Sequence, residues 1–150
     1  MSTKSRPPGT ADVSVPGGRA RLAPDPVVPG SVPDAALVAA RSADAKLGEA
    51  TVVMAMGDLL AVTDAFVVTS AGNSRQVKAI VEDVEAQLKV QAGRAPLRIE
   101  GMGDLQWVLM DYGDMVVHVF LHETRRLYDL ERLWGDAPRV TWNDMAVEAT

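Results

Sequence analysis

Asp111 and Asp114 are the first candidates for chemistry in this sequence, because they flank the turn of a predicted hairpin. Paired carboxylates can serve as acid and base or bind a metal ion. Alternate residues of a strand share a face, so Asp-x-Asp pairs converge, whereas two Asp residues separated by a turn usually do not. We therefore expect Asp114 to cap the turn and Asp111 to bond the backbone or meet a partner, with catalysis as the minor alternative.

His118 lies in a strand-like segment, where alternation places it on one face with Val116 and Phe120. A histidine with apolar neighbours on its face is more often a buried or half-buried packing residue than a base or a ligand. The chain has no cysteine, and a zinc site would need three or four ligands. His122 follows the strand and is not at helical spacing from His118, so we expect no metal site.

Residues 70–74, Ser-Ala-Gly-Asn-Ser, form a loop of small residues between a predicted strand and a predicted helix. Such loops can bind phosphate at a helix N-terminus. This one lacks the G-x-G-x-x-G pattern and the P-loop lysine, and neither Ser70 nor Ser74 lies in a G-x-S-x-G elbow. We expect a tight turn followed by a helix N-cap.

Trp107 begins a strand whose alternation separates it, with Leu109 and Asp111, from Met110 and Tyr112. An exposed Trp beside an Asp is typical of protein interfaces, where Trp and Tyr often contribute most to affinity. A core position for Trp107 is equally compatible with the pattern. The basic side chains at the helices are expected to be solvated; they are Arg75, Lys78, Arg125, Arg126 and Arg132.

Strand-like and helix-like segments alternate along most of the chain. The predicted helices run from Asp34, a possible N-cap, to Gly48, from a capping box at residues 73–76 to Gly93, and over residues 123–137. The predicted strands cover residues 51–56, 63–70, 97–100, 108–110 and 115–121. The resulting order αββαβββα predicts an α/β or α+β fold with a mixed five-stranded sheet and flanking helices.

Composition divides the chain into three parts. Residues 1–33 contain seven of the nine prolines and no aromatic residue, so we expect a disordered extension. Residues 34–137 form the single folded domain, and residues 138–150 a C-terminal tail containing Trp142. The extension has a net charge of +2, so the remaining 11 basic and 18 acidic residues carry −7. This balance disfavours extensive binding to nucleic acid and favours a basic protein partner.

The sequence has no secretory signal and no apolar run of the length that spans a membrane. Together with the absence of cysteine, this pattern suits a cytoplasmic protein.

Several motifs in combination resemble the ribosomal silencing factor family, also called Iojap or YbeB. They are TDAFVVTSA at 63–71, NSRQV at 73–77, Glu100-Gly101, WVLMDYGDMVVHVF at 107–120, RRLY at 125–128, and Leu130, Glu131, Leu133 and Trp134. The resemblance covers residues 34–137, and the extension before them is unusual.

The resemblance implies a nucleotidyltransferase-like fold without transferase activity or a cofactor. Family members bind the fourteenth protein of the large ribosomal subunit, block joining of the subunits and lower translation when nutrients are scarce. The expected partner-binding residues are Trp107 as anchor, with Asp111, Tyr112, Asp114 and His118 around it. A nucleotidyltransferase-like enzyme that binds nucleotide is the main alternative, and an RNA-binding module is a weaker one. A homodimer is left open.

Overall fold

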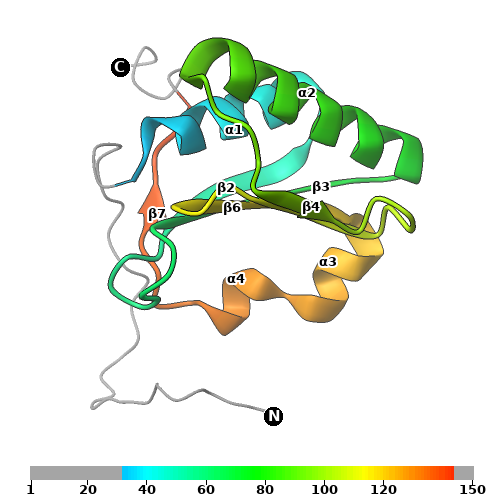
Figure 1. The fold of residues 1–150 in the computed structure, drawn as a ribbon. Coiled ribbons are helices and arrows are strands. Elements are labelled where there is room, and N and C mark those ends of the chain that lie inside the picture. Colours follow the sequence, from blue (N-terminus) through cyan, green and yellow to red (C-terminus); the bar gives the residue numbers. More distant parts are fainter. Residues whose placement is uncertain (1–31, 144–150) are drawn as a thin grey trace.

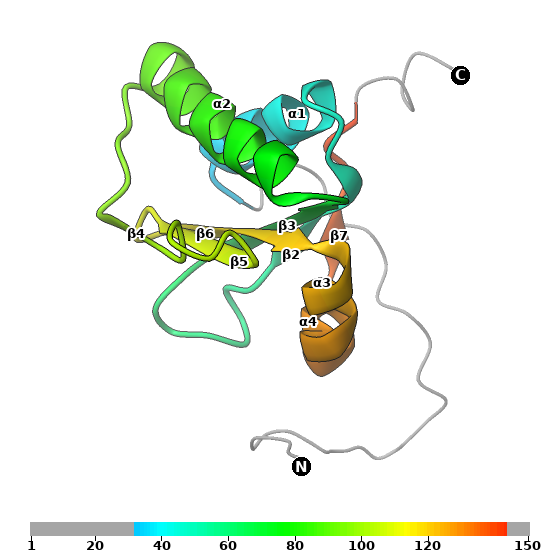
Figure 2. The same cartoon turned by 90° about the vertical axis from the view of Figure 1, so that its right-hand side faces the viewer.

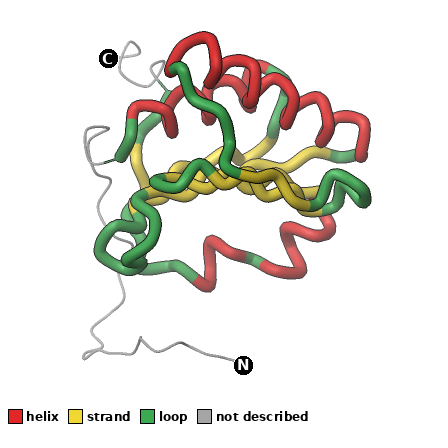
Figure 3. Tube along the Cα trace, in the orientation of Figure 1, coloured by secondary structure: helices red, strands yellow, loops and turns green. Residues whose placement is uncertain are grey.

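A six-stranded mixed sheet lies between two pairs of helices in the computed structural model, which describes residues 32–143 (Figure 1). Figure 3 shows the strands as one central layer with helices above and below it. In chain order the elements are α1 (Asp34–Ala45), β2 (Glu49–Ala55), β3 (Ala65–Ala71), α2 (Ser74–Ala92), β4 (Arg98–Glu100), β5 (Trp107–Asp111), β6 (Met115–Leu121), α3 (His122–Tyr128), α4 (Leu130–Leu133) and β7 (Arg139–Val140). The α/β class and the flanking helices are as predicted.

The strand order is β4-β5-β6-β3-β2-β7. The β3–β6 pair is parallel, with Val67 opposite Val117, and the other pairs are antiparallel. All seven residues of β3 are buried, as expected for a strand paired on both sides and covered on both faces. The β-branched sequence of residues 65–71 therefore forms the centre of the sheet.

Helices α1 and α2 cover one face of the sheet (Figure 1). The apolar positions of α2, among them Val77, Ile80 and Leu88, are buried at helical spacing. The side chain of Asn73 accepts a hydrogen bond from the Gln76 backbone N–H at 2.9 Å, so Asn73 is the N-cap that the sequence predicted. Gly93 ends the helix in the left-handed conformation (φ +64°), also as predicted.

Helices α3 and α4 are short and lie on the opposite face. Figure 2 shows them beneath one side of the sheet, with β4 at the other side. The prediction of one continuous helix over residues 123–137 is wrong, because Asp129 adopts a left-handed conformation (φ 47°) that ends α3 and precedes α4. Side chains of this face remain partly accessible, among them Leu109, Asp111 and Val116.

The predicted strand count of five is also corrected, because β7 adds a sixth strand in the segment expected to be a tail. This strand has two residues and pairs with β2, and so short a run is not predicted from sequence although Val140 favours strands. Trp142 follows it, packs against the core and donates its indole N–H to the Thr51 carbonyl at 3.0 Å. Asp34 lies in the first turn of α1, whose N-cap position is Pro33, so the N-cap prediction for Asp34 is wrong.

The sequence predicted a disordered extension over residues 1–33. Residues 1–31 of this segment lie outside the described part of the chain. Among the described helices, none has the length and apolar character that a membrane span requires.

Candidate protein-binding face

Trp107 is the centre of an aromatic cluster on the sheet face that carries α3 and α4. Its indole ring stacks on Phe120 with 5.0 Å between ring centroids and contacts Tyr128 at 4.7 Å. Its N–H donates to Nδ1 of His118 at 3.1 Å. The side chain is half-buried. The sequence left open whether Trp107 is a core residue or an exposed interface residue. The structure combines the two, because the side chain packs against the sheet and is still partly exposed.

The backbone at Gly101 lies very close to the Trp107 carbonyl group. Gly101 has φ +98°, and a Cβ atom there would lie 2.1 Å from the Trp107 carbonyl oxygen. Only glycine accommodates both the conformation and the close contact. The Glu100-Gly101 motif thus provides the glycine that the close contact with the first residue of β5 requires.

His118 supports Trp107 from within the sheet. It is only 4% exposed, and burial lowers its pKa from 6.5 to about 4, so the ring is neutral near pH 7. Because Nδ1 accepts from Trp107, the ring proton resides on Nε2, which is buried without a hydrogen-bond partner among the described residues. The edge of His118 meets Phe66, with 4.7 Å between the ring centroids. The expected buried packing role of His118 is confirmed.

Asp111 and Asp114 occupy separate environments. Asp111 accepts from the Gly113 N–H at 2.8 Å and pairs with Arg98 at 3.5 Å. Asp114 pairs with Arg94 at 2.6 Å. The expectation that Asp114 caps the turn is wrong, because Asp111 caps it. The expected bond of Asp111 to the backbone is confirmed. Each carboxylate is engaged by a different arginine.

Tyr112 does not share the face of Trp107. It is 3% exposed and belongs to the core beneath α1 and α2. Burial, and then the nearby Glu85, raise its pKa to about 12. The Arg94 guanidinium lies 5.8 Å from its ring centroid. Of the five predicted partner-binding residues, the structure thus brings together Trp107, Asp111 and His118 on one face. It places Tyr112 on the other face and Asp114 in the turn.

The loop at residues 70–74 forms a strand-to-helix turn, as predicted. Ser70 is 3% exposed, and its hydroxyl accepts from Arg125 at 3.0 Å. Asn73 caps α2, as described above. Among residues 32–143, no three His, Asp or Glu side chains are grouped so that they could hold a metal ion.

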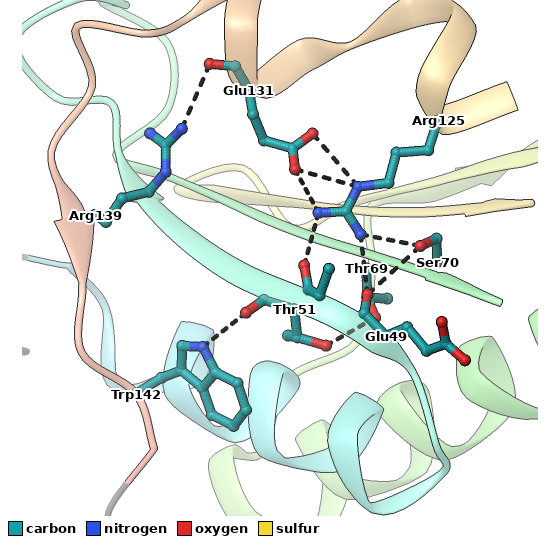
Figure 4. Close-up of polar contacts among 9 residues, drawn as sticks. Glu49, Thr51, Thr69, Ser70, Arg125, Glu131, Arg139 and Trp142 are labelled. Atoms are coloured by element: carbon teal, nitrogen blue, oxygen red, sulfur yellow. Dashed lines mark hydrogen bonds and ion pairs between the residues drawn. The ribbon is translucent and has the colours of Figure 1, made fainter. Parts of the chain in front are cut away.

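Arg125 was expected on a solvated helix surface, and this prediction is wrong. The side chain is 8% exposed and points from α3 toward the strands (Figure 4). It donates to the carbonyls of Glu49 and Ala50 at 3.0 and 2.6 Å and forms an ion pair with Glu131. The run of two arginines in RRLY gave no indication of which one is buried.

The two short helices also carry exposed apolar side chains, and one of them, Tyr128, contacts Trp107. Leu127 is 77% exposed, Tyr128 51% and Leu133 56%. Large exposed apolar side chains, together with a half-buried tryptophan, are typical of a surface that binds another protein. The sequence predicted one helix for these residues, whereas the structure divides them between α3 and α4 at Asp129.

Comparisons with known proteins agree on one family. The family model described as "Ribosomal silencing factor during starvation" matches residues 29–150. Ribosomal silencing factor RsfS of Bacillus subtilis is 38% identical over 101 residues, which cover 67% of this chain and 85% of that protein. The mouse protein named mitochondrial assembly of ribosomal large subunit protein 1 is 38% identical over 74 residues, 48% of this chain and 32% of that protein.

Two solved structures share the fold. A crystal structure of a protein from Chromobacterium violaceum has a TM-score of 0.65 and 33% identity, covering 68% of this chain and 84% of that one. A crystal structure from Bacillus halodurans has a TM-score of 0.60 and 35% identity, covering 69% and 93%.

Proposed function

Since this chain belongs to the ribosomal silencing factor family, we propose that it binds the large ribosomal subunit in the cytoplasm and prevents subunit joining. Its direct contact is the fourteenth large-subunit protein, and its effect is lower translation when nutrients are scarce. The observation that carries the proposal is the half-buried Trp107 on the sheet face that α3 and α4 cover only in part. The name of the mouse relative, which concerns assembly of the large ribosomal subunit, points in the same direction.

The mechanism requires no bond to be made or broken. A folded body on a surface that the two subunits share excludes the other subunit by its volume. The acidic balance of residues 34–150 favours encounter with a basic ribosomal protein. A standard interface would bury roughly 800 Å² on each partner. Trp107 is the anchor in this proposal, and Asp111 is the neighbouring acidic group.

His118, Tyr112 and Asp114 take indirect roles in this interface. His118 holds the indole N–H of Trp107, while Tyr112 and Asp114 fix the hairpin turn through Arg94. The proposal therefore keeps all five predicted residues in one structural unit but assigns direct contact with the partner to Trp107 and Asp111.

Sedimentation in sucrose gradients tests the proposal with purified ribosomal subunits. The protein should co-sediment with large subunits and reduce their reassociation with small subunits. Trp107→Ala should stay folded and lose at least about 2 kcal/mol of binding free energy, as expected for an interface anchor. Normal reassociation at saturating protein would overturn the proposed function, and unchanged binding of Trp107→Ala would remove that residue from the interface.

The alternative of a nucleotidyltransferase-like enzyme is tested by titration with nucleotide and magnesium. The engagement of Asp111 and Asp114 by different arginines argues against it. Binding of nucleotide, or its turnover, would favour the enzyme. A steep salt dependence of binding to naked RNA would instead favour an RNA-binding module. Sedimentation equilibrium of the protein alone decides between a monomer and a homodimer.

A further inference from the structure

Arg125 uses its full hydrogen-bonding capacity inside the protein. Its Nη1 donates to the Glu49 carbonyl and to the Ser70 hydroxyl, both at 3.0 Å. Its Nη2 donates to the Ala50 carbonyl at 2.6 Å and to the Glu131 carboxylate, and its Nε donates to Glu131 at 3.2 Å. A guanidinium has five N–H donors, and all five are engaged. A lysine has three donors on one atom and cannot reproduce this geometry.

The acceptors for Arg125 are created by an irregularity in β2. The pairing of β2 with β3 shifts register between Glu49 and Val52. Ala50 in this bulge has a φ of 50°, which is unfavourable for a residue with a Cβ atom. The bulge leaves the carbonyls of Glu49 and Ala50 free to accept from the helix side (Figure 4). Bulges often re-aim groups in this way.

The contacts of Arg125 join α3, α4 and the sheet into one unit. Glu131 belongs to α4, on the far side of the left-handed Asp129. Between the two partners, Tyr128 ends α3 and contacts Trp107 at 4.7 Å. Helices of seven and four residues are too short to hold their place without tertiary contacts. The ion pair of Arg125 and Glu131 therefore brackets Tyr128, with one partner in α3 and the other in α4.

We propose that Arg125 is a positioning residue for partner binding, which acts by holding Tyr128 against Trp107. The inference rests on the proposed function, in which the Trp107 face meets a ribosomal partner. Arg125 itself is buried, so its effect on affinity passes through the exposed residues of α3 and α4. The sequence alone did not suggest this role.

The test compares Arg125→Lys with the matched control Arg126→Lys, whose side chain is exposed on the same helix. Both variants keep the charge. We expect Arg125→Lys to weaken binding to isolated large subunits about tenfold and Arg126→Lys to change it less than about twofold. Circular dichroism at the binding temperature verifies that the variants are folded. Equal affinities of the two folded variants would overturn the proposal.

A double-mutant cycle with Tyr128→Ala separates positioning from general loss of structure. If Arg125 acts through Tyr128, the double variant binds no more weakly than the weaker single variant, because residues in one network are not additive. Effects that multiply would contradict the proposal. The ¹H–¹⁵N indole resonance of Trp107, assigned with Trp107→Phe, supplies a readout without ribosomes: it should shift in Arg125→Lys and stay in place in Arg126→Lys.

If Arg125→Lys does not fold, the same test can be made with Glu131→Gln. This substitution removes the ion pair but leaves an oxygen that can accept a hydrogen bond from Arg125. It should weaken binding and couple to Tyr128→Ala in the same manner, and additive effects would overturn the proposal. Failure of the proposed function gives a different result: the unmodified protein would not bind large subunits, while the indole shift in the Arg125 or Glu131 variant would still report the positioning.

Discussion

The two faces of the sheet are built in different ways. One face is covered by α1 and α2, with 12 and 19 residues, over a core of aliphatic side chains. The other carries α3 and α4, with seven and four residues, over an aromatic cluster and the buried Arg125. Burial of aliphatic surface stabilises a fold without specifying a partner. On the second face, polar contacts of Arg125 accompany aromatic and apolar side chains that reach the surface, which is the arrangement that the proposed binding role needs.

The largest effect on stability is expected on the face covered by α1 and α2. Ile80→Ala removes a fully buried side chain from α2 and should lower the free energy of unfolding by about 3 kcal/mol. Affinity of the folded protein for large subunits should not change, because Ile80 lies on the far side of the sheet from Trp107. Urea denaturation and binding at low temperature measure the two quantities. A parallel loss of affinity would show that the faces are not independent.

A pH effect is expected from the face that carries Trp107. Burial lowers the pKa of folded His118 to about 4, whereas an unfolded histidine titrates near 6.5. Protons therefore bind preferentially to the unfolded chain between these values, and stability falls as the pH falls. The loss between pH 7 and pH 5 should be about 2 kcal/mol.

The control for this effect is His118→Gln, which keeps an acceptor for Trp107 but does not titrate. The difference between the two proteins in urea denaturation isolates His118 from the carboxylates and from His122. An identical pH dependence in both proteins would show that His118 is not held neutral by the fold.

A side-chain N-cap distinguishes α2 from the short helices of the other face. Asn73→Ala removes the side-chain cap of α2 and should lower the free energy of unfolding by about 1 kcal/mol. The helices α3 and α4 have no side-chain cap, so they depend on tertiary contacts. Hydrogen exchange should show slower exchange in α2 than in α3, and Asn73→Ala should reduce that difference. Faster exchange in α2 than in α3 in the unmodified protein would contradict this comparison.

The smallest effect on stability is expected at the surface. Leu127→Ser on α3 and Val90→Ser on α2 replace side chains that are 77% and 80% exposed. Each should change the free energy of unfolding by less than about 0.5 kcal/mol. Leu127→Ser should nevertheless weaken binding to large subunits, while Val90→Ser should not. Equal binding by both variants would exclude Leu127 from the interface.

Much of the fold follows from local sequence patterns. The periodicity of residues 77–88, the cap at Asn73 and the stop at Gly93 predicted α2 correctly. The β-branched run of residues 115–121 predicted β6 with its exact bounds. Each of these signals depends on residues that are close together in the sequence. The elements that they predict are therefore the ones observed in the structure.

Other features depend on contacts between distant residues. The strand β7 exists because β2 offers a partner for residues 139–140. The break at Asp129 interrupts a segment whose pattern predicts one helix. Local propensity predicts neither feature, because a strand of two residues needs a partner and the pattern around Asp129 is helical on both sides.

The sequence by itself determined the class of the fold, the central strands, the longest helix and the family. It also named Trp107 and Asp111, which share one face of the sheet. Only the tertiary structure decided that Tyr112 faces α1 and α2, that Asp111 rather than Asp114 caps the turn, and that Arg125 is buried. The physical reason is that a side chain's environment depends on partners far along the chain, such as Glu49 for Arg125, 76 residues away.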